Sequence, residues 1–278
     1  MMELFVDGLS VQLRGFHDLS WLSGYGRVFK VFDQLTGGTL CFGLDNGRQQ
    51  LYLRYAGAPT INYPGTSEAS IARLRQAAQN YQGIRHAALV PLLESRAMPG
   101  GYLCIFPWSD GVPVGPLEEN YALLRTAPAL GRLNMIDALI DLHVTLEERG
   151  LVALGLSEAH LLYDATMQRV QLSSIDDYAN MPILNTRGRT PGSPFYLAPE
   201  CYEPAAALDE TTTVYLLGAL THLFFGDRAH PDRRAWTMSP VLYEVAATAM
   251  QKDRDRRYQS TRLLQSAWRR AVLSTPLY

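Results

Sequence analysis

The sequence predicts an α+β protein with a strand-rich first part and a mainly helical second part. Up to about residue 107, aromatic and branched apolar residues alternate with polar ones between turn residues, a pattern typical of antiparallel strands. Beyond residue 116, apolar residues recur instead at the spacing of amphipathic helices. The 278 residues are 47% hydrophobic and 19% charged, which excludes disordered, collagen-like and coiled-coil chains. We expect an N-terminal lobe over 1–107, a connector over 108–116 and a C-terminal lobe over 117–278.

Three consecutive antiparallel strands open the first part. Arg27 to Phe32 alternates polar and apolar residues, and Thr39 to Leu44 is a second apolar run. Asn46-Gly47 is a strong hairpin signal, and the strand Gln50 to Tyr55 follows it.

One helix and two further strands complete the expected first lobe. Ser67 to Tyr81 has apolar residues at helical spacing and lacks glycine and proline, with Ser67 as the expected N-cap. Leu89 to Leu93 and Tyr102 to Phe106 are predicted as strands joined by the turn Met98 to Gly101. The first lobe is therefore predicted as a five-stranded sheet with one helix.

The second part is predicted to be mainly helical. An amphipathic helix is expected first, two short strands and a long irregular segment follow, and a buried helix precedes two more amphipathic helices. In order, these segments are Leu130 to Gly150, Leu161 to Tyr163, Val170 to Leu172, Asp176 to Pro199, Val214 to Phe225, Val241 to Met250 and Thr261 to Leu273.

Charge and cysteine content exclude several function classes. Lys+Arg 25 against Asp+Glu 27 gives a formal charge of -2, so the sequence predicts neither nucleic-acid nor membrane binding. Cys41, Cys104 and Cys201 are far apart without metal-ligand spacing, which favours buried thiols in a reducing compartment, and hence the cytoplasm. Met1 to Gly15 lacks the pattern of a signal peptide.

Several segments resemble the protein-kinase superfamily, in the order that the family has them. Gly192 to Glu200 ends in Ala-Pro-Glu and resembles the end of a kinase activation segment. Gly150-Leu151-Val152 resembles the entry to the catalytic loop, and Val214 to Gly218 resembles the buried C-lobe helix. Asp253 to Tyr258 resembles the stretch whose arginine pairs with the Ala-Pro-Glu glutamate. The resemblance implies a two-lobed kinase-like fold of serine/threonine-kinase type, and the compact chain with its use of arginine over lysine favours a bacterial-type protein.

Two further expectations follow from this resemblance. Arg257 and Glu200 are expected to form a buried or partly buried ion pair. Thr213 stands where kinases have an aspartate that braces the catalytic loop, and its hydroxyl is expected to make part of that bonding.

The catalytic positions of a kinase are substituted in this sequence. In register from Gly150, the proton-accepting aspartate is replaced by Gly155, and the magnesium-binding asparagine by His160. The magnesium aspartate of Asp-Phe-Gly is replaced by Ser174. No catalytic or metal-binding residue is therefore expected, although Asp176 or Asp177, just beyond Ser174, is the alternative source of a carboxylate near phosphate.

The nucleotide-binding positions of the first lobe are also altered. Arg54 replaces the strand lysine, and the helical stretch from Ala69 to His86 offers no glutamate to pair with it. In the turn Asp33 to Thr39, Gly37 and Gly38 either present backbone N–H groups to an anion or form a plain hairpin turn.

Smaller motifs have simpler interpretations. Gly155 to Ala159 resembles a hydrolase nucleophile elbow, but a strand follows where a helix is required, so Ser157 is not expected to be a nucleophile. His86 and His143 are expected to be structural. Whether Thr190 or Ser193 is phosphorylated is left open by the sequence.

The sequence thus favours a catalytically degraded kinase fold, a pseudokinase that acts as a regulatory or partner-binding module. Its protein partner is not identified by the sequence, and no cofactor is expected. Any ATP binding, near Arg54, Gly37, Gly38 and Asp176, is expected to be weak and independent of magnesium. The alternatives are a divergent serine/threonine kinase or nucleotidyl transferase, and a module that senses nucleotide without metal.

Overall fold

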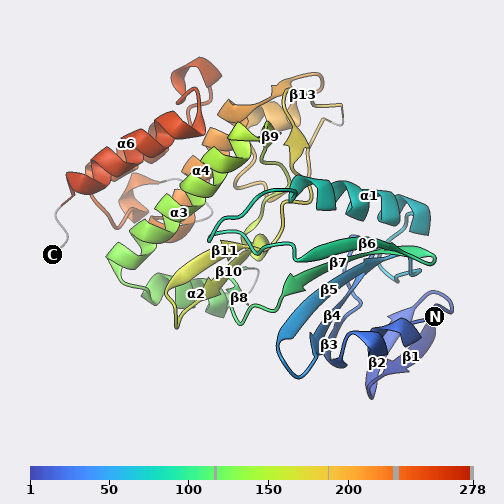
Figure 1. The fold of residues 1–278 in the computed structure, drawn as a ribbon. Helices are drawn as coiled ribbons and strands as arrows, with labels where there is room; N and C mark the ends of the chain where they lie inside the picture. Colours follow the sequence, from blue (N-terminus) through green and yellow to red (C-terminus); the bar gives the residue numbers. More distant parts are fainter. Residues whose placement is uncertain (116–117, 187, 228–231, 276–278) are drawn as a thin grey trace. The chain divides into compact units, whose positions relative to one another are not determined.

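The computed structural model describes residues 1–115, 118–186, 188–227 and 232–275, and in these it is a mixed α+β protein (Figure 1). The α+β class predicted from the sequence is therefore confirmed. The chain divides into two compact units. The first contains 1–83 and 90–110, and the second contains 84–89 and 111–278.

The first unit contains a five-stranded antiparallel sheet in the order β3-β4-β5-β7-β6. The strands are β3 (Arg27–Phe32), β4 (Thr39–Asp45), β5 (Gln50–Ala56), β6 (Glu94–Met98) and β7 (Gly101–Pro107). Helix α1 (Ser67–Asn80) lies between β5 and β6 in the sequence and packs against β7 and β5 (Figure 1). The predicted sheet and helix are thus present.

An N-terminal hairpin in this unit was not predicted. It consists of β1 (Met2–Val6) and β2 (Leu9–Leu13), and the short 3-10 helix η1 (Ser20–Gly24) follows it. Asp7 and Gly8 form the two-residue turn with φ angles of 50° and 84°. Positive φ at both turn residues is the geometry that Asp-Gly favours in hairpins, so the signal was present in the sequence.

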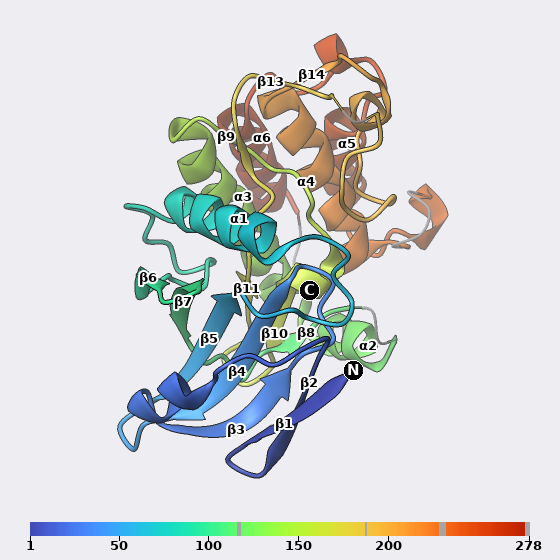
Figure 2. The same ribbon diagram turned by 90° about the vertical axis from the view of Figure 1, so that its right-hand side faces the viewer.

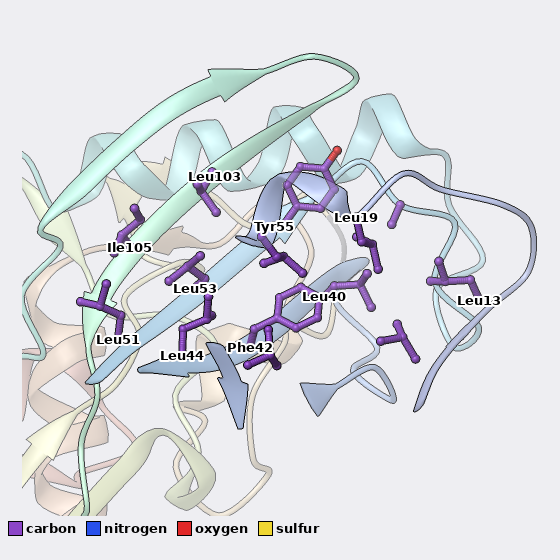
Figure 3. Packing of buried hydrophobic residues seen from close by; sticks show 14 residues of the cluster. Leu13, Leu19, Leu40, Phe42, Leu44, Leu51, Leu53, Tyr55, Leu103 and Ile105 are labelled. Atoms are coloured by element: carbon purple, nitrogen blue, oxygen red, sulfur yellow. The ribbon is translucent and has the colours of Figure 1, made fainter. Parts of the chain in front are cut away.

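The core of the first unit lies on the sheet face that the hairpin and η1 cover (Figure 3). Alternate residues of the three central strands point to this face, because successive side chains of a strand point to opposite sides. Leu13 from β2 and Leu19, just before η1, pack with them. The strand residues of this core are Leu40, Phe42, Leu44, Leu51, Leu53, Tyr55, Leu103 and Ile105.

The second unit is mainly helical, as predicted (Figure 2). Its helices are α2 (Glu118–Thr126), α3 (Ala129–Glu148), α4 (Glu210–Phe225), α5 (Pro240–Ala249) and α6 (Thr261–Leu273). Its 3-10 helices are η2 (Glu158–His160), η3 (Pro199–Tyr202), η4 (Arg233–Ala235) and η5 (Arg254–Arg256). Its strands are β8 (Val112–Pro113), β9 (Leu151–Val152), β10 (Leu161–Asp164), β11 (Arg169–Leu172), β12 (Ala179–Asn180), β13 (Ile183–Leu184) and β14 (Ala207–Leu208). Within the described ranges, no helix has the length and apolar character that crossing a bilayer requires.

Several predicted boundaries were wrong. The apolar run Leu89 to Leu93 is not a strand, and the strand begins only at Glu94. Leu89 is 1% exposed and makes a single bridge to Leu172, so its apolar character reflects burial and not sheet pairing. The N-cap of α1 is Thr66, whose hydroxyl accepts from the Ala69 N–H. Helix α2 was not predicted.

Both histidines expected to be structural are hydrogen-bonded in the second unit. His86 Nε2 lies 3.1 Å from Asp141 Oδ2. His143 is buried on α3, with Nδ1 2.7 Å from the Leu139 carbonyl oxygen and Nε2 2.7 Å from the Tyr178 hydroxyl. Burial lowers the pKa of His143 from 6.5 to about 4, because a charged imidazolium would lose its hydration there.

The lowered pKa of His143 predicts acid sensitivity. The unfolded chain takes up a proton on this residue as the pH falls below about 6.5, whereas the folded protein resists protonation until about pH 4. Stability is therefore lost across this window. Between pH 7 and 4, the wild type should lose on the order of 3 kcal/mol more unfolding free energy than His143→Gln. Urea unfolding at a series of pH values measures the difference, and parallel profiles for the two proteins would contradict it.

Candidate functional site

The second unit brings five of the predicted site residues together. A small cavity of about 10 Å³, about the space one water molecule needs, is lined by Leu154, Gly155, Leu156, His160, Ser174, Asp176, Asp177 and Tyr178. These residues come from the loop between β9 and β10 and from the turn after β11. The positions that the kinase resemblance assigned to base and metal ligands are therefore neighbours in the structure.

Gly155 is held in a conformation that leaves no room for a side chain. Its φ is +71°, in the left-handed region that residues other than glycine rarely adopt. A Cβ atom placed on it would lie 2.5 Å from Asp177 Cβ and 2.6 Å from Asp177 Oδ2. The side chain of Asp177 thus occupies the space that a catalytic side chain at position 155 would need.

The irregular segment after β13 lies against the same loop. The Ser193 N–H donates to the Leu156 carbonyl oxygen at 3.3 Å. A Cβ on Gly192 would lie 3.2 Å from that oxygen and 3.4 Å from the carbonyl carbon of Gly155. Asp177 on one side and Gly192-Ser193 on another therefore confine the loop, which accounts for the small volume of the cavity.

His160 forms local bonds with Ser157. Its Nδ1 accepts the Ser157 N–H at 3.2 Å and lies 3.2 Å from the Ser157 hydroxyl oxygen. The His160 N–H in turn donates to the Ser157 carbonyl oxygen at 3.0 Å. The two residues form a capping box around η2, and β10 follows directly. The pair thus has a structural arrangement, without the strand-turn-helix of a nucleophile elbow.

Ser174 also acts within its own turn. Its hydroxyl accepts from the Asp176 N–H at 3.2 Å, which is a serine turn that redirects the chain after β11. Among the described residues, no group of three or more His, Cys, Asp or Glu side chains is placed to hold a metal ion.

Thr213 contacts the loop in the way the resemblance implied. It lies in the first turn of α4, and its Oγ1 accepts from the Ala153 N–H at 3.0 Å. Both residues are 2% exposed. One buried hydroxyl therefore fixes the backbone two residues before Gly155.

The expected ion pair between Arg257 and Glu200 is present and buried. Arg257 Nη1 and Nη2 lie 2.7 and 2.9 Å from the two carboxylate oxygens of Glu200, a bidentate arrangement. The Thr212 hydroxyl donates to Glu200 at 2.9 Å, and Arg257 donates further to the carbonyl oxygens of Gln251 and Thr211. Every charge in this cluster is thus matched by several hydrogen bonds.

The pKa of Glu200 shows that this network outweighs the cost of burial. Removal from water alone would raise the pKa of the Glu200 carboxyl. Hydrogen bonds and positive charge from Arg257, with smaller contributions from the backbone and Thr212, bring this pKa below its usual value. Glu200 is therefore charged at neutral pH despite its burial.

In the first unit, Gly37 and Gly38 lie in the turn between β3 and β4. The Arg73 guanidinium donates to the Gly37 carbonyl oxygen at 2.5 Å. Gly38 has a φ of +74°, and a Cβ on it would lie 2.6 Å from Tyr63 Cδ1 and 2.9 Å from Ser70 Cβ. The side chains around α1 thus fill the space beside both glycines, which favours the plain hairpin turn over an anion cradle.

Arg54 lies in the middle of the sheet, directly between Cys41 and Cys104 of the neighbouring strands. Its guanidinium lies 5.9 Å from the centre of the Phe106 ring. Two positions earlier on the same strand is Tyr52.

Tyr52 belongs to an aromatic cluster on the sheet. Its ring centre lies 5.8 Å from that of Phe32 and 6.3 Å from that of Trp108. Trp108 and Phe29 pack over Gly43, where an added Cβ would lie 2.8 Å from either ring. The sequence shows these aromatic residues only at separate positions, whereas the structure shows that their rings lie together.

The two candidate phosphorylation sites differ in accessibility. Thr190 is 5% exposed, and its N–H donates to the Cys201 carbonyl oxygen. Ser193 is partly exposed. Of the arginines close to them in the sequence, Arg189 donates to the Gly192 carbonyl oxygen, and Arg187 lies outside the described residues.

No protein-family model matches this sequence, and a search of curated proteins gives no match either. Function is therefore inferred from the residues and their geometry.

An aspartate introduced at position 155 should destabilise the protein. Gly155→Asp must adopt a left-handed φ, which costs about 1–2 kcal/mol, and must also displace Asp177. Gly150→Asp is the matched control, because Gly150 has a φ of +74° with open space around its Cβ position. Gly155→Asp should therefore lower the unfolding free energy more than Gly150→Asp does. Equal losses in urea unfolding would mean that Asp177 does not occupy this space.

Breaking the buried ion pair should be costly. Arg257→Met leaves Glu200 charged and buried, so about 3–5 kcal/mol of unfolding free energy should be lost. The double variant Arg257→Met/Glu200→Met should lose less than the sum of the two single variants. Arg233→Met, which breaks the exposed pair with Glu244, should cost less than about 1 kcal/mol. Chemical denaturation of the wild type and the four variants measures these differences, and additive losses would argue against coupling.

Proposed function

We propose that this protein is a pseudokinase, a two-lobed protein-kinase-like fold without phosphoryl transfer that acts by binding a protein partner. Three features support the kinase-like fold. The five-stranded sheet has one helix inserted between its third and fourth strands along the chain. Glu200 of the Ala-Pro-Glu sequence pairs with Arg257, and Thr213 braces the loop at Ala153.

The arrangement at Gly155 is the main observation that supports the absence of phosphoryl transfer. Phosphoryl transfer needs a group that accepts the hydroxyl proton and a positioned metal that neutralises phosphate charge. Position 155 cannot carry a side chain in its observed conformation. His160 and Ser174 engage their own turns through hydrogen bonds. A substrate hydroxyl would have to displace these contacts before any group could act on it.

The first unit supports weak nucleotide binding at most. The glycine turn is packed by Arg73 and Tyr63, so its backbone does not form an open cradle for phosphate. Tyr52 adds an aromatic ring at a position where kinases have alanine. Both features reduce the space available to a nucleotide beside Arg54.

One observation favours the alternative, a divergent active kinase or nucleotidyl transferase. The Asp177 carboxylate lies beside Gly155, so a carboxylate remains close to the position from which the family aspartate would extend. Asp176 lies next to it and lines the same cavity. If either carboxylate accepted the proton, activity would depend on that residue.

A transfer assay separates the two functions. With radiolabelled ATP and magnesium or manganese, the wild type should incorporate no phosphate above background into itself or into generic protein substrates. Asp176→Ala and Asp177→Ala should be indistinguishable from it. Robust incorporation that one of these substitutions abolishes would establish the alternative and identify the residue responsible.

Calorimetric titration with ATP, with and without magnesium, tests the remaining third function, nucleotide sensing. We expect binding that is weak or undetectable and unaffected by magnesium. Arg54→Ala controls for the site, because it should abolish whatever binding the wild type shows. Tight binding that requires magnesium would refute this expectation.

A further inference from the structure

A cavity of about 370 Å³ lies in the first unit, where the β1–β2 hairpin meets η1. It is lined by the end of β1, the turn residue Asp7, and residues 16–20, 22 and 23. Its volume falls in the range of pockets that hold ligands or anchor side chains of partners. Nothing in the proposed kinase-like function uses this part of the chain.

Exposed aromatic residues stand at this cavity. Phe5 is 69% exposed and Phe16 is 72% exposed, and both line it. Leu4 and Leu19 supply further apolar wall. Large apolar side chains gathered around a hollow mark surfaces that bind a partner more often than singly scattered ones do.

The charged groups lining the cavity are all acidic. Asp7 Oδ2 accepts from the Val28 N–H at 2.6 Å, and Asp18 Oδ1 accepts from the Ser20 N–H at 2.9 Å. Each of these bonds uses one of the two carboxylate oxygens. No lysine or arginine is among the lining residues, and burial lowers the pKa of His17, which favours its neutral form at pH 7. The cavity therefore complements a cation.

The outer edge of β1 supplies a second, independent feature. Among the described residues, β1 pairs only with β2, so one of its two edges has no neighbouring strand (Figures 1 and 2). In a hairpin with a two-residue turn, Val6 and Leu9 form the hydrogen-bonded pair nearest the turn. Hydrogen-bonded and non-hydrogen-bonded pairs alternate along an antiparallel hairpin, so Glu3 and Phe5 belong to non-hydrogen-bonded pairs. Their backbone N–H and C=O groups therefore point away from β2. An open edge of this kind can accept an added strand.

We propose that this surface, the outer edge of β1 with the adjoining cavity, binds an extended segment of a partner protein that carries basic side chains beside apolar ones. The segment pairs with the backbone of Glu3 and Phe5 as an added strand. Its apolar side chain packs between Phe5 and Phe16, and its basic side chain lies against Asp18. The proposal goes beyond the pseudokinase function and does not depend on it, because no residue of the kinase-like site takes part.

Fluorescence anisotropy with two labelled peptides tests the proposal. One eight-residue peptide repeats Val-Val-Arg-Arg, so that each face of the strand carries both valine and arginine, and the other repeats Val-Val-Glu-Glu. The arginine peptide should bind the full-length protein, more weakly as salt rises, and the glutamate peptide should not bind. An arginine peptide N-methylated on alternate backbone nitrogens should lose binding, because strand pairing needs those N–H groups.

Substitutions then locate the binding. Asp18→Asn keeps an acceptor for Ser20 but removes the charge, and should weaken binding about two- to fivefold. Phe16→Ala should weaken it further. Asp45→Asn is the matched control, because Asp45 makes a similar turn bond to Gly47 outside the cavity, so binding should be unchanged.

Three results would overturn the proposal. They are equal binding of both peptides, absence of binding by the arginine peptide, and equal effects of Asp18→Asn and Asp45→Asn. A dimer in sedimentation that Phe5→Pro dissociates would also overturn it, because the edge of β1 would then be occupied by a second copy of the chain. None of these results bears on phosphoryl transfer, so failure here is distinguishable from failure of the pseudokinase function.

Discussion

The buried pairing of Arg257 with Glu200 is the interaction on which the organisation of the second unit depends. It joins η3 to the loop before α6, and Thr212 adds the first turn of α4 to the same cluster. Arg254, three residues earlier, binds Asp209 at the N-cap of α4 at 2.5 Å. Two arginines from one short segment thus fix the start of the most buried helix. A pair of this kind need not add net stability. It does raise the free energy of alternative packings, because each of these would leave a buried charge without its partner.

The closed site is a consequence of this anchoring. Because Glu200 is held in place, the path of the segment just before it is restricted. This segment contacts the loop through the hydrogen bond from the Ser193 N–H to the Leu156 carbonyl oxygen. Thr213 holds the same loop by a second contact, the hydrogen bond from the Ala153 N–H to its hydroxyl oxygen. The loop is therefore fixed from two directions, and Gly155, between these contacts, takes the left-handed turn against which Asp177 packs.

The sequence predicted those parts of the fold whose signals are local. Helices α3, α4 and α6 combine apolar spacing with clear ends, and the strands on either side of Asn46-Gly47 follow from turn chemistry. Leu89 to Leu93 was mistaken for a strand because its first two residues, Leu89 and Val90, are apolar and buried without strand pairing, whereas Leu93 is exposed. At the site, sequence register identified which residues meet. It could not show that Asp177 fills the space at Gly155, because that depends on a contact between loops about 20 residues apart.

The residues around Gly155 share a physical property that bears on the proposed function. An active site holds polar groups whose bonding is completed only by substrate or metal, and this incompleteness costs stability. Here the corresponding positions take part in local structure: His160 accepts from Ser157, Ser174 accepts from Asp176, and Gly155 admits Asp177. At each of these positions, the side chain or the backbone thus stabilises its own loop. A ligand entering this site would have to break those bonds without the metal and charge that repay the cost in a kinase. The proposed partner binding would instead use surfaces where the chain leaves apolar and charged groups exposed.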